Sequence, residues 1–173
     1  MIFAFSSSIV IPADNPVYFF TATVLYWKHL LKPDKYKKII LSSMEFMTQK
    51  KRMLISGFVI MPNHIHMICS VCEGHKLKDI QRDMLKFTSQ QIKFDLVENH
   101  PEVLKEFIST QNDRKFQIWE RRPLAVPLYT YEVIEQKLEY IHRNPIHKKW
   151  NLAENEEDYY YSSASYYLSG KDR

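Results

Sequence analysis

Residues 58–68, FVIMPNHIHMI, decide the fold class, because two apolar runs meet there at a turn. The runs at residues 53–60 and 64–71 have the length of strands. Pro62 and Asn63 between them are turn-forming residues, and a proline also interrupts strand pairing. An antiparallel hairpin is therefore predicted, with residues 53–60 as its first strand and residues 64–71 as its second.

The chain on either side of this hairpin alternates between strand and helix patterns. Residues 17–26 are rich in β-branched and aromatic side chains, which indicates a buried strand, and residues 33–49 have apolar residues at helical spacing. A second helical pattern covers residues 76–99, and a short alternating segment at residues 115–119 is predicted to be the fourth strand. This order predicts an α+β fold, the ferredoxin-like split βαβ sandwich, with the hairpin central and both helices on one face of the antiparallel sheet.

Two details of this prediction depend on single residues. In the second helix, Ile80, Met84 and Phe87 recur at three- and four-residue spacing and form the expected buried stripe. After the fourth strand, Pro123 and Pro127 are interpreted as strand breakers.

A further helix is predicted beyond the sheet. Residues 131–143 have Ile134, Leu138 and Ile141 as a buried stripe, and Pro145 ends the helix. This helix must pack beside the sheet. The aromatic segment at residues 158–168 could cap the domain or stack on bases, and packing is favoured because aromatic side chains are usually buried.

Length and composition limit the function classes. A chain of 173 residues suits a single domain, here residues 1–173 with a core at about 17–150 and a C-terminal tail at 151–173. With three glycines and no G-x-G-x-x-G or Walker-type motif, phosphate-cradling nucleotide folds are excluded. No apolar run is long enough to span a membrane, so a cytoplasmic protein without a membrane partner is expected.

The charge pattern is consistent with a polyanionic partner. The formal net charge is +4, and the basic residues gather in clusters such as residues 28–38 and 143–149. Solvated surface lysines and arginines would explain the same pattern equally well.

Cys69 and Cys72 have a C-x-x-C spacing that is found in zinc sites and redox pairs. No second pair of ligands completes a zinc module, and residues three apart in an extended segment face opposite sides. Neither role is favoured, and reduced thiols are expected.

His64 and His66 are the strongest candidates for a metal site. A strand alternates its faces, so both imidazoles point to the same side while Ile65 points to the other. Imidazole is a common ligand for divalent metals, but two histidines alone make an incomplete site. A pair of hydrogen-bonded or surface histidines is the more frequent explanation of an isolated H-x-H pattern.

The helix at residues 131–143 contributes two more candidates. Tyr140 and Asn144 are four residues apart and share a helix face, and an amide oxygen is a suitable ligand for a hard cation. The alternatives are an ordinary amphipathic tyrosine and an asparagine that only ends the helix before Pro145.

These motifs together resemble a known family. The stretch at residues 58–68, followed by residues 138–146 (LEYIHRNPI), is similar to the single-tyrosine HUH transposases (transposase IS200-like), specifically to the REP-associated tyrosine transposase branch. The resemblance extends from residue 18 to residue 164. The chain departs from the family pattern at residues 146–150 and in an insertion at residues 96–112.

The resemblance implies that the chain is an enzyme, a DNA transposase and endonuclease that cleaves and rejoins single-stranded or hairpin DNA. It implies His64, His66 and Asn144 as ligands of Mg or Mn, and Tyr140 as the nucleophile that forms a 5′-phosphotyrosine. Phosphate or DNA contacts are expected from a set of basic residues near these motifs, namely Lys137, Arg143, Arg121, Arg122 and Lys148. A monomer is favoured over a homodimer.

Two other functions remain open from the sequence. A non-catalytic nucleic-acid-binding protein of the same fold would explain the basic clusters and the aromatic tail. A zinc hydrolase would need Cys72 beside His64 and His66. An extended chain between His66 and Cys72 spans about 20 Å, which disfavours that site.

Overall fold

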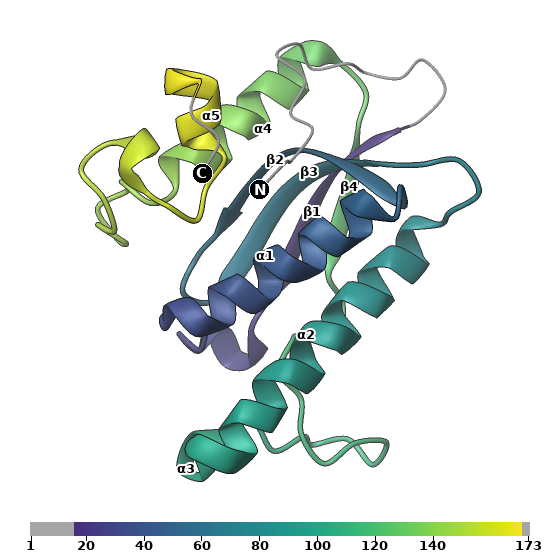
Figure 1. The fold of residues 1–173 in the computed structure, drawn as a ribbon, viewed down its shortest axis with the longest axis vertical. Helices are drawn as coiled ribbons and strands as arrows, with labels where there is room; N and C mark the ends of the chain where they lie inside the picture. The colour runs from purple at the N-terminus through teal and green to yellow at the C-terminus, as the bar shows by residue number, and fades with distance from the viewer. Residues whose placement is uncertain (1–15, 171–173) are drawn as a thin grey trace.

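A four-stranded antiparallel sheet forms the centre of the computed structural model, which describes residues 16–170. Its strands are β1 (Val17–Thr23), β2 (Met53–Ile60), β3 (His64–Val71) and β4 (Leu124–Leu128). The spatial order is β2-β3-β1-β4, and all three neighbouring pairs are antiparallel. This is the ferredoxin-like order, so the predicted α+β class is confirmed (Figure 1).

The predicted hairpin is confirmed with its bounds, but its place in the sheet is different. β3 and β1 are the two central strands, whereas β2 lies at one edge. The prediction that the whole hairpin is central was therefore wrong. α1 connects β1 to β2, but these two strands do not pair with each other. β3 lies between them and pairs with both, which leaves β2 outermost.

The fourth strand was predicted in the wrong segment. Residues 115–119 do not join the sheet but make isolated bridges, Ile108 with Phe116 and Val24 with Trp119. β4 instead contains Pro127, which lies opposite Tyr18. A proline is compatible with this position because β4 is an edge strand, where the missing N–H can be on the unpaired side.

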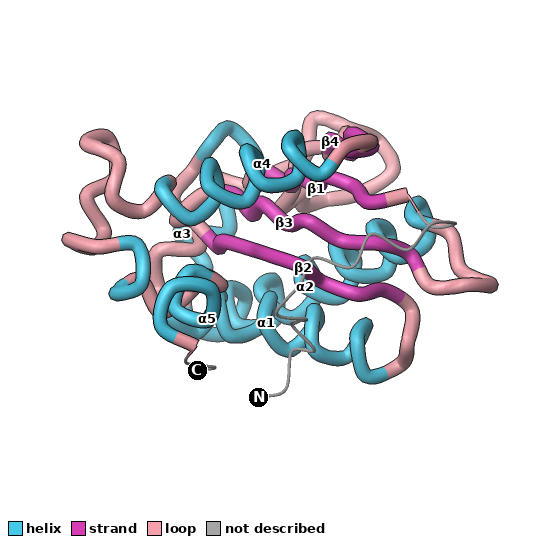
Figure 2. The backbone as a smooth tube through the Cα atoms, turned by 90° about the horizontal axis from the view of Figure 1, so that it is seen from above, coloured by secondary structure: helices cyan, strands magenta, loops and turns pink. Residues whose placement is uncertain are grey.

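Helices cover both faces of the sheet, as Figure 2 shows. α1 (Asp34–Gln49) and α2 (Leu77–Asn99) pack together on one face, as predicted. α4 (Tyr131–Arg143) lies on the other face, over β2 and β3. The short elements are η1 (Leu25–Trp27), α3 (Pro101–Lys105), η2 (Glu156–Asp158) and α5 (Ala164–Ser169).

The C-terminal tail covers the outer edge of β2. The N–H of Ile60 donates to the carbonyl of Tyr161 at 2.9 Å, and the N–H of Ser163 donates to the carbonyl of Phe58 at 3.0 Å. Tyr159 and Tyr161 are buried. The tail thus has the predicted packing role, and it protects an edge strand that could otherwise pair with another chain.

None of the helices within residues 16–170 is long and apolar enough to cross a membrane.

Candidate functional site

His64 and His66 lie next to each other on the face of β3 that α4 covers. Their ring centroids are 4.6 Å apart, and both side chains are buried. Gly57, which pairs with Ile68 of β3, faces two α4 side chains and so identifies the covered face. The sequence prediction that both imidazoles share one face is borne out by their adjacency.

Each imidazole is oriented by a hydrogen bond at Nδ1. The distance from His64 Nδ1 to Asn63 Oδ1 is 2.6 Å, and the distance from His66 Nδ1 to Thr21 Oγ1 is 2.8 Å. An amide oxygen only accepts, so Nδ1 of His64 carries the proton and Nε2 keeps its lone pair. The Thr21 hydroxyl can hold His66 in the same tautomer, because a hydroxyl can accept. Hydrogen bonds of this kind orient metal-binding histidines.

Burial keeps both imidazoles neutral. Loss of solvent, together with the nearby charge of Lys149, lowers the pKa of His64 to about 4. The pKa of His66 falls to about 3 for the same main reason, with contributions from His64 and Lys137. Neutral imidazole is the form that binds a metal ion.

Tyr140 of α4 contacts His66 directly. The two ring centroids are 5.5 Å apart, and Phe19 of β1 lies against both rings, at 5.1 Å from His66 and 6.2 Å from Tyr140. The tyrosine side chain is 49% exposed, so an incoming substrate can reach its hydroxyl. Lys137, one turn earlier, is part-buried, and its Nζ lies 5.7 Å from the centroid of the Tyr140 ring. Lys137 is thus at the site rather than fully solvated.

The packing of α4 on β2 fixes the position of Tyr140. Leu138 and Ile141 are buried against the sheet at Gly57, where a Cβ atom would lie only 2.4 Å from Leu138 Cδ1. His142, on the buried side, hydrogen-bonds through Nε2 to Ser163 Oγ at 2.8 Å, and burial lowers its pKa to about 4. His142 therefore supports the packing of the helix and is turned away from the site.

Asn144 is the C-cap residue of α4, and its side chain turns back to the helix. Its Nδ2 donates to the carbonyl of Tyr140 at 3.1 Å, and no hydrogen bond within residues 16–170 joins its side chain to His64 or His66. In the same part of the chain, no third His, Cys, Asp or Glu completes a metal-binding group. The assignment of Asn144 as third ligand therefore stays a prediction.

The zinc hydrolase alternative is not supported. Cys72 does not join His64 and His66 in any group of three metal-binding side chains within residues 16–170. Its N–H donates to the carbonyl of Arg52, at the end of β3 that is far from Asn63. Both cysteines are free thiols.

Two tryptophans near His64 were not recognised as site residues in the sequence. The ring of Trp27 lies 6.2 Å from that of His64, and the ring of Trp150 lies 5.7 Å from it. Trp27 ends the three-residue element η1 and Trp150 lies in a turn, and neither segment is long enough for a periodic pattern to indicate which way a side chain points. Their closeness to His64 depends on tertiary contacts.

The predicted DNA-contacting cations lie in two separate regions. Arg143 flanks Tyr140 and forms ion pairs with Glu139 at 3.1 Å and with Glu156 at 3.8 Å. Lys148 is exposed in the turn after α4. Arg143 lines a shallow pocket that also includes Gln136, Glu139, Tyr140, Asn144 and His147.

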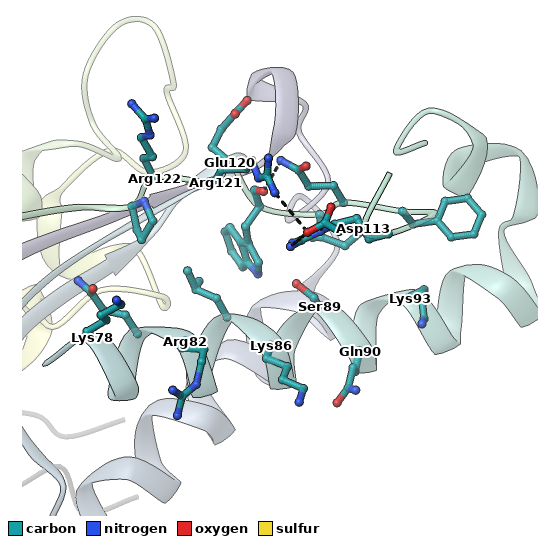
Figure 3. A pocket seen from close by; sticks show the side chains of 18 residues that line it. Lys78, Arg82, Lys86, Ser89, Gln90, Lys93, Asp113, Glu120, Arg121 and Arg122 are labelled. Atoms are coloured by element: carbon teal, nitrogen blue, oxygen red, sulfur yellow. Dashed lines mark hydrogen bonds and ion pairs between the residues drawn. The ribbon is translucent and has the colours of Figure 1, made fainter. Parts of the chain in front are cut away.

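Arg121 and Arg122 lie away from this pocket, in a groove between α2 and residues 113–123 (Figure 3). α2 covers the face of the sheet opposite to α4, so the groove is not adjacent to Tyr140. Arg121 is held by Asp113 at 3.2 Å and by Gln111 Oε1 at 2.7 Å. Five further cations line the groove: Lys78, Arg82, Lys86, Lys93 and Arg114.

Comparison with known proteins identifies the fold. No family model matches the sequence, and no curated protein matches it either. Among solved structures, a REP-associated tyrosine transposase bound to a REP hairpin aligns with 91% of this chain and 82% of its own chain, with a TM-score of 0.64 and 18% identity. The chain has the fold of that transposase. Because 91% of the chain is aligned, the likeness to the REP-associated transposase extends well beyond the four-stranded sheet.

A second solved structure is less similar. A putative transposase from Deinococcus radiodurans R1 aligns with 75% of this chain and 90% of its own, with a TM-score of 0.49 and 12% identity.

Proposed function

We propose that this chain is a metal-dependent DNA strand transferase that cleaves and rejoins single-stranded or hairpin DNA with Tyr140 as its nucleophile. The observation that supports this most is the direct contact between Tyr140 and His66, with His64 beside them on the same face of the sheet. A half-exposed tyrosine in contact with one of two adjacent neutral imidazoles combines a nucleophile with a metal-binding pair.

The proposed reaction exchanges one phosphate ester for another. The hydroxyl oxygen of Tyr140 attacks the phosphorus of a DNA phosphodiester and loses its proton to solvent. The bond from phosphorus to the 3′ oxygen breaks, and that oxygen takes up a proton. The products are a 5′-phosphotyrosine and a free 3′-hydroxyl. Attack by a second 3′-hydroxyl reverses the reaction and joins two strands, which requires no nucleotide cofactor.

The residues present fit a divalent cation. The Nε2 atoms of His64 and His66 have free lone pairs when Nδ1 carries the proton, and Asn144 Oδ1 is the proposed third ligand. A site with two or three protein ligands leaves positions for water or a phosphate oxygen. Mg²⁺ or Mn²⁺ bound there would withdraw charge from the phosphate and orient it for in-line attack.

Lys137 has a supporting role in this proposal. Its Nζ lies 5.7 Å from the centroid of the Tyr140 ring, so its positive charge is close to the proposed nucleophile. It can hold a phosphate oxygen, and Arg143 and Lys148 are proposed as further contacts to the DNA backbone.

The choice of DNA partner draws on the structural neighbour. That transposase was solved bound to a REP hairpin, and this chain shares its fold over most of its length. Hairpin DNA with a single-stranded flank is therefore the substrate class to test first.

The direct test is a covalent adduct assay. Hairpin oligonucleotides labelled at the 3′ end are incubated with the protein and Mg²⁺ or Mn²⁺, and the label should migrate with the protein under denaturing conditions. Tyr140→Phe and His66→Ala should abolish the adduct. Tyr131→Phe is a matched control, because Tyr131 lies on the same helix and is 46% exposed. Equal absence of adduct in wild type and Tyr140→Phe across a broad substrate library refutes the proposal.

A second candidate, a non-catalytic DNA-binding protein, is favoured by the basic groove at Arg121 and Arg122. This function predicts salt-sensitive DNA binding that survives substitution of His64 and His66 and gives no adduct.

A further inference from the structure

The turn at Tyr26 and Trp27 combines backbone strain with exposed aromatic rings. Both residues have positive φ angles, 56° and 57°, in the left-handed region that favours glycine. Their side chains are 57% and 60% exposed. Neither ring is buried in the core, so core packing does not explain a strained aromatic pair here. Strained backbone of this kind clusters at functional sites.

Asn63 holds this turn and also orients His64. Its Nδ2 donates to the carbonyl of Trp27 at 3.0 Å, while its Oδ1 accepts from His64 Nδ1 at 2.6 Å. The backbone carbonyl of Asn63 accepts from the N–H of Val24 at 2.8 Å. Asn63 itself is only 3% exposed. A single buried amide therefore fixes the Trp27 turn relative to His64.

A second indole is also placed next to His64. The Trp150 ring lies 5.7 Å from His64 and 5.5 Å from His29, and Lys149 Nζ lies 5.2 Å from the Trp150 ring centroid. The surroundings of His64 thus combine exposed aromatic surface with positive charge. This combination suits a nucleic acid strand, whose bases stack on rings while its phosphates attract cations.

We infer that Trp27, together with Trp150, forms a stacking site for an unpaired base of the DNA strand, next to the phosphate that Tyr140 attacks. The inference rests on the proposed function for the position of that phosphate. A ring centroid 6.2 Å from His64 is within reach of a base whose own phosphate faces the histidine. Stacking tolerates any base, so the site positions the strand without reading its sequence.

The test is a binding assay that needs no cleavage. The full chain carrying Tyr140→Phe is titrated with a mixed-sequence single-stranded oligonucleotide, and affinity is measured by fluorescence anisotropy. Trp27→Ala should weaken binding about tenfold, whereas Trp27→Phe should stay within about threefold of the parent. Trp27→Leu should behave like alanine, because it keeps an apolar side chain without a ring. Phe94→Ala, on α2 and 59% exposed, is the matched control and should leave affinity unchanged.

Several outcomes would overturn the stacking site. Equal losses of DNA affinity for Trp27→Ala and Phe94→Ala would do so. So would a Trp27→Leu variant that binds DNA as tightly as the parent with Trp27. A shift from dimer to monomer with Trp27→Ala in sedimentation, with affinity unchanged, would show that a second copy of the chain occupies the surface instead. Melting temperatures of all variants show whether each is folded.

The two proposals fail separately. If wild type forms the adduct but Trp27→Ala binds DNA like the parent, the stacking site fails and the strand transferase stands. If the Trp27 effect is present but no adduct forms on any substrate, the binding site stands and the catalytic proposal fails.

Discussion

Substitution of Gly57 by alanine should disturb the packing of the helix that carries Tyr140. The added Cβ would lie 2.4 Å from Leu138 Cδ1 and 3.3 Å from Ile141 Cδ1. The first distance is about 1 Å shorter than an ordinary carbon contact, so Leu138 or the whole of α4 must move. Overpacking of this kind costs about 2 kcal/mol of the free energy of unfolding, which corresponds to a melting temperature lower by about 4–8 °C in a chain of this length.

The assay combines urea denaturation with the adduct assay. A double variant, Gly57→Ala with Leu138→Ala, relieves the clash. Its loss in free energy of unfolding should therefore be smaller than the sum of the two single losses by about 1 kcal/mol or more. Adduct formation should fall in Gly57→Ala and recover in part in the double variant. Gly74→Ala is the control. Its Cβ meets nothing within 4 Å, so its cost comes only from a φ of +78° and should leave adduct formation unchanged. If the two losses in free energy of unfolding are additive and Gly57→Ala forms the adduct normally, the packing of α4 at Gly57 does not position Tyr140.

Three further predictions concern other contacts. Asn63→Ala leaves the buried Nδ1–H of His64 and the part-buried carbonyl of Trp27 without these partners and should lower the free energy of unfolding by about 1–3 kcal/mol; an unchanged free energy in urea denaturation would contradict this. The Lys35 ammonium, with help from Tyr36, lowers the pKa of Asp95 to about 2 from 3.8. The stability that this carboxylate contributes is present above pH 3.8 and lost as the pH falls towards 2. Between pH 3.8 and 2 the wild type should lose about 1 kcal/mol of unfolding free energy that Asp95→Asn does not lose, a small value because the carboxyl is partly exposed. An unchanged pH profile of the melting temperature in Asp95→Asn would argue against this. Lys86→Ala in the α2 groove should reduce the slope of log affinity against log salt for DNA by about one if the groove holds the backbone, whereas an unchanged slope would exclude that contact.

The hairpin and its histidines could be predicted from the sequence because local rules determine them. Pro62 and Asn63 separate two apolar runs, and strand alternation then requires His64 and His66 to share a face. The bounds of α4 were predictable for a similar reason, since its buried stripe and Pro145 are both local signals.

The errors came from features that tertiary structure decides. Pro127 was interpreted as a strand breaker, but it is tolerated in β4 because β4 is an edge strand. Phe87 was assigned to the buried stripe of α2 but is 43% exposed, and the buried positions continue instead through Thr88 and Ile92. A helical pattern alone does not decide between these two registers when apolar residues occur on both.

Part of the site was also hidden from the sequence. Thr21 orients His66 from a neighbouring strand, and Trp27 reaches His64 from a strained turn, so both contacts depend on strand register and loop geometry. The spacing of Tyr140 and Asn144 predicted a shared helix face but could not indicate that the Asn144 amide turns back to the Tyr140 carbonyl.

The most direct test of the central claim is to locate the DNA adduct by mass spectrometry. Trypsin cleaves after Lys137 and Arg143, and the peptide between them, residues 138–143, contains Tyr140 as its single tyrosine. After incubation with hairpin DNA and Mg²⁺ or Mn²⁺, this peptide should carry a 5′-phosphonucleotide, and the modified peptide should be absent when the metal is chelated or when His66 is replaced by alanine. An adduct on a different peptide, or one that forms equally without metal and without His66, would contradict the proposed site.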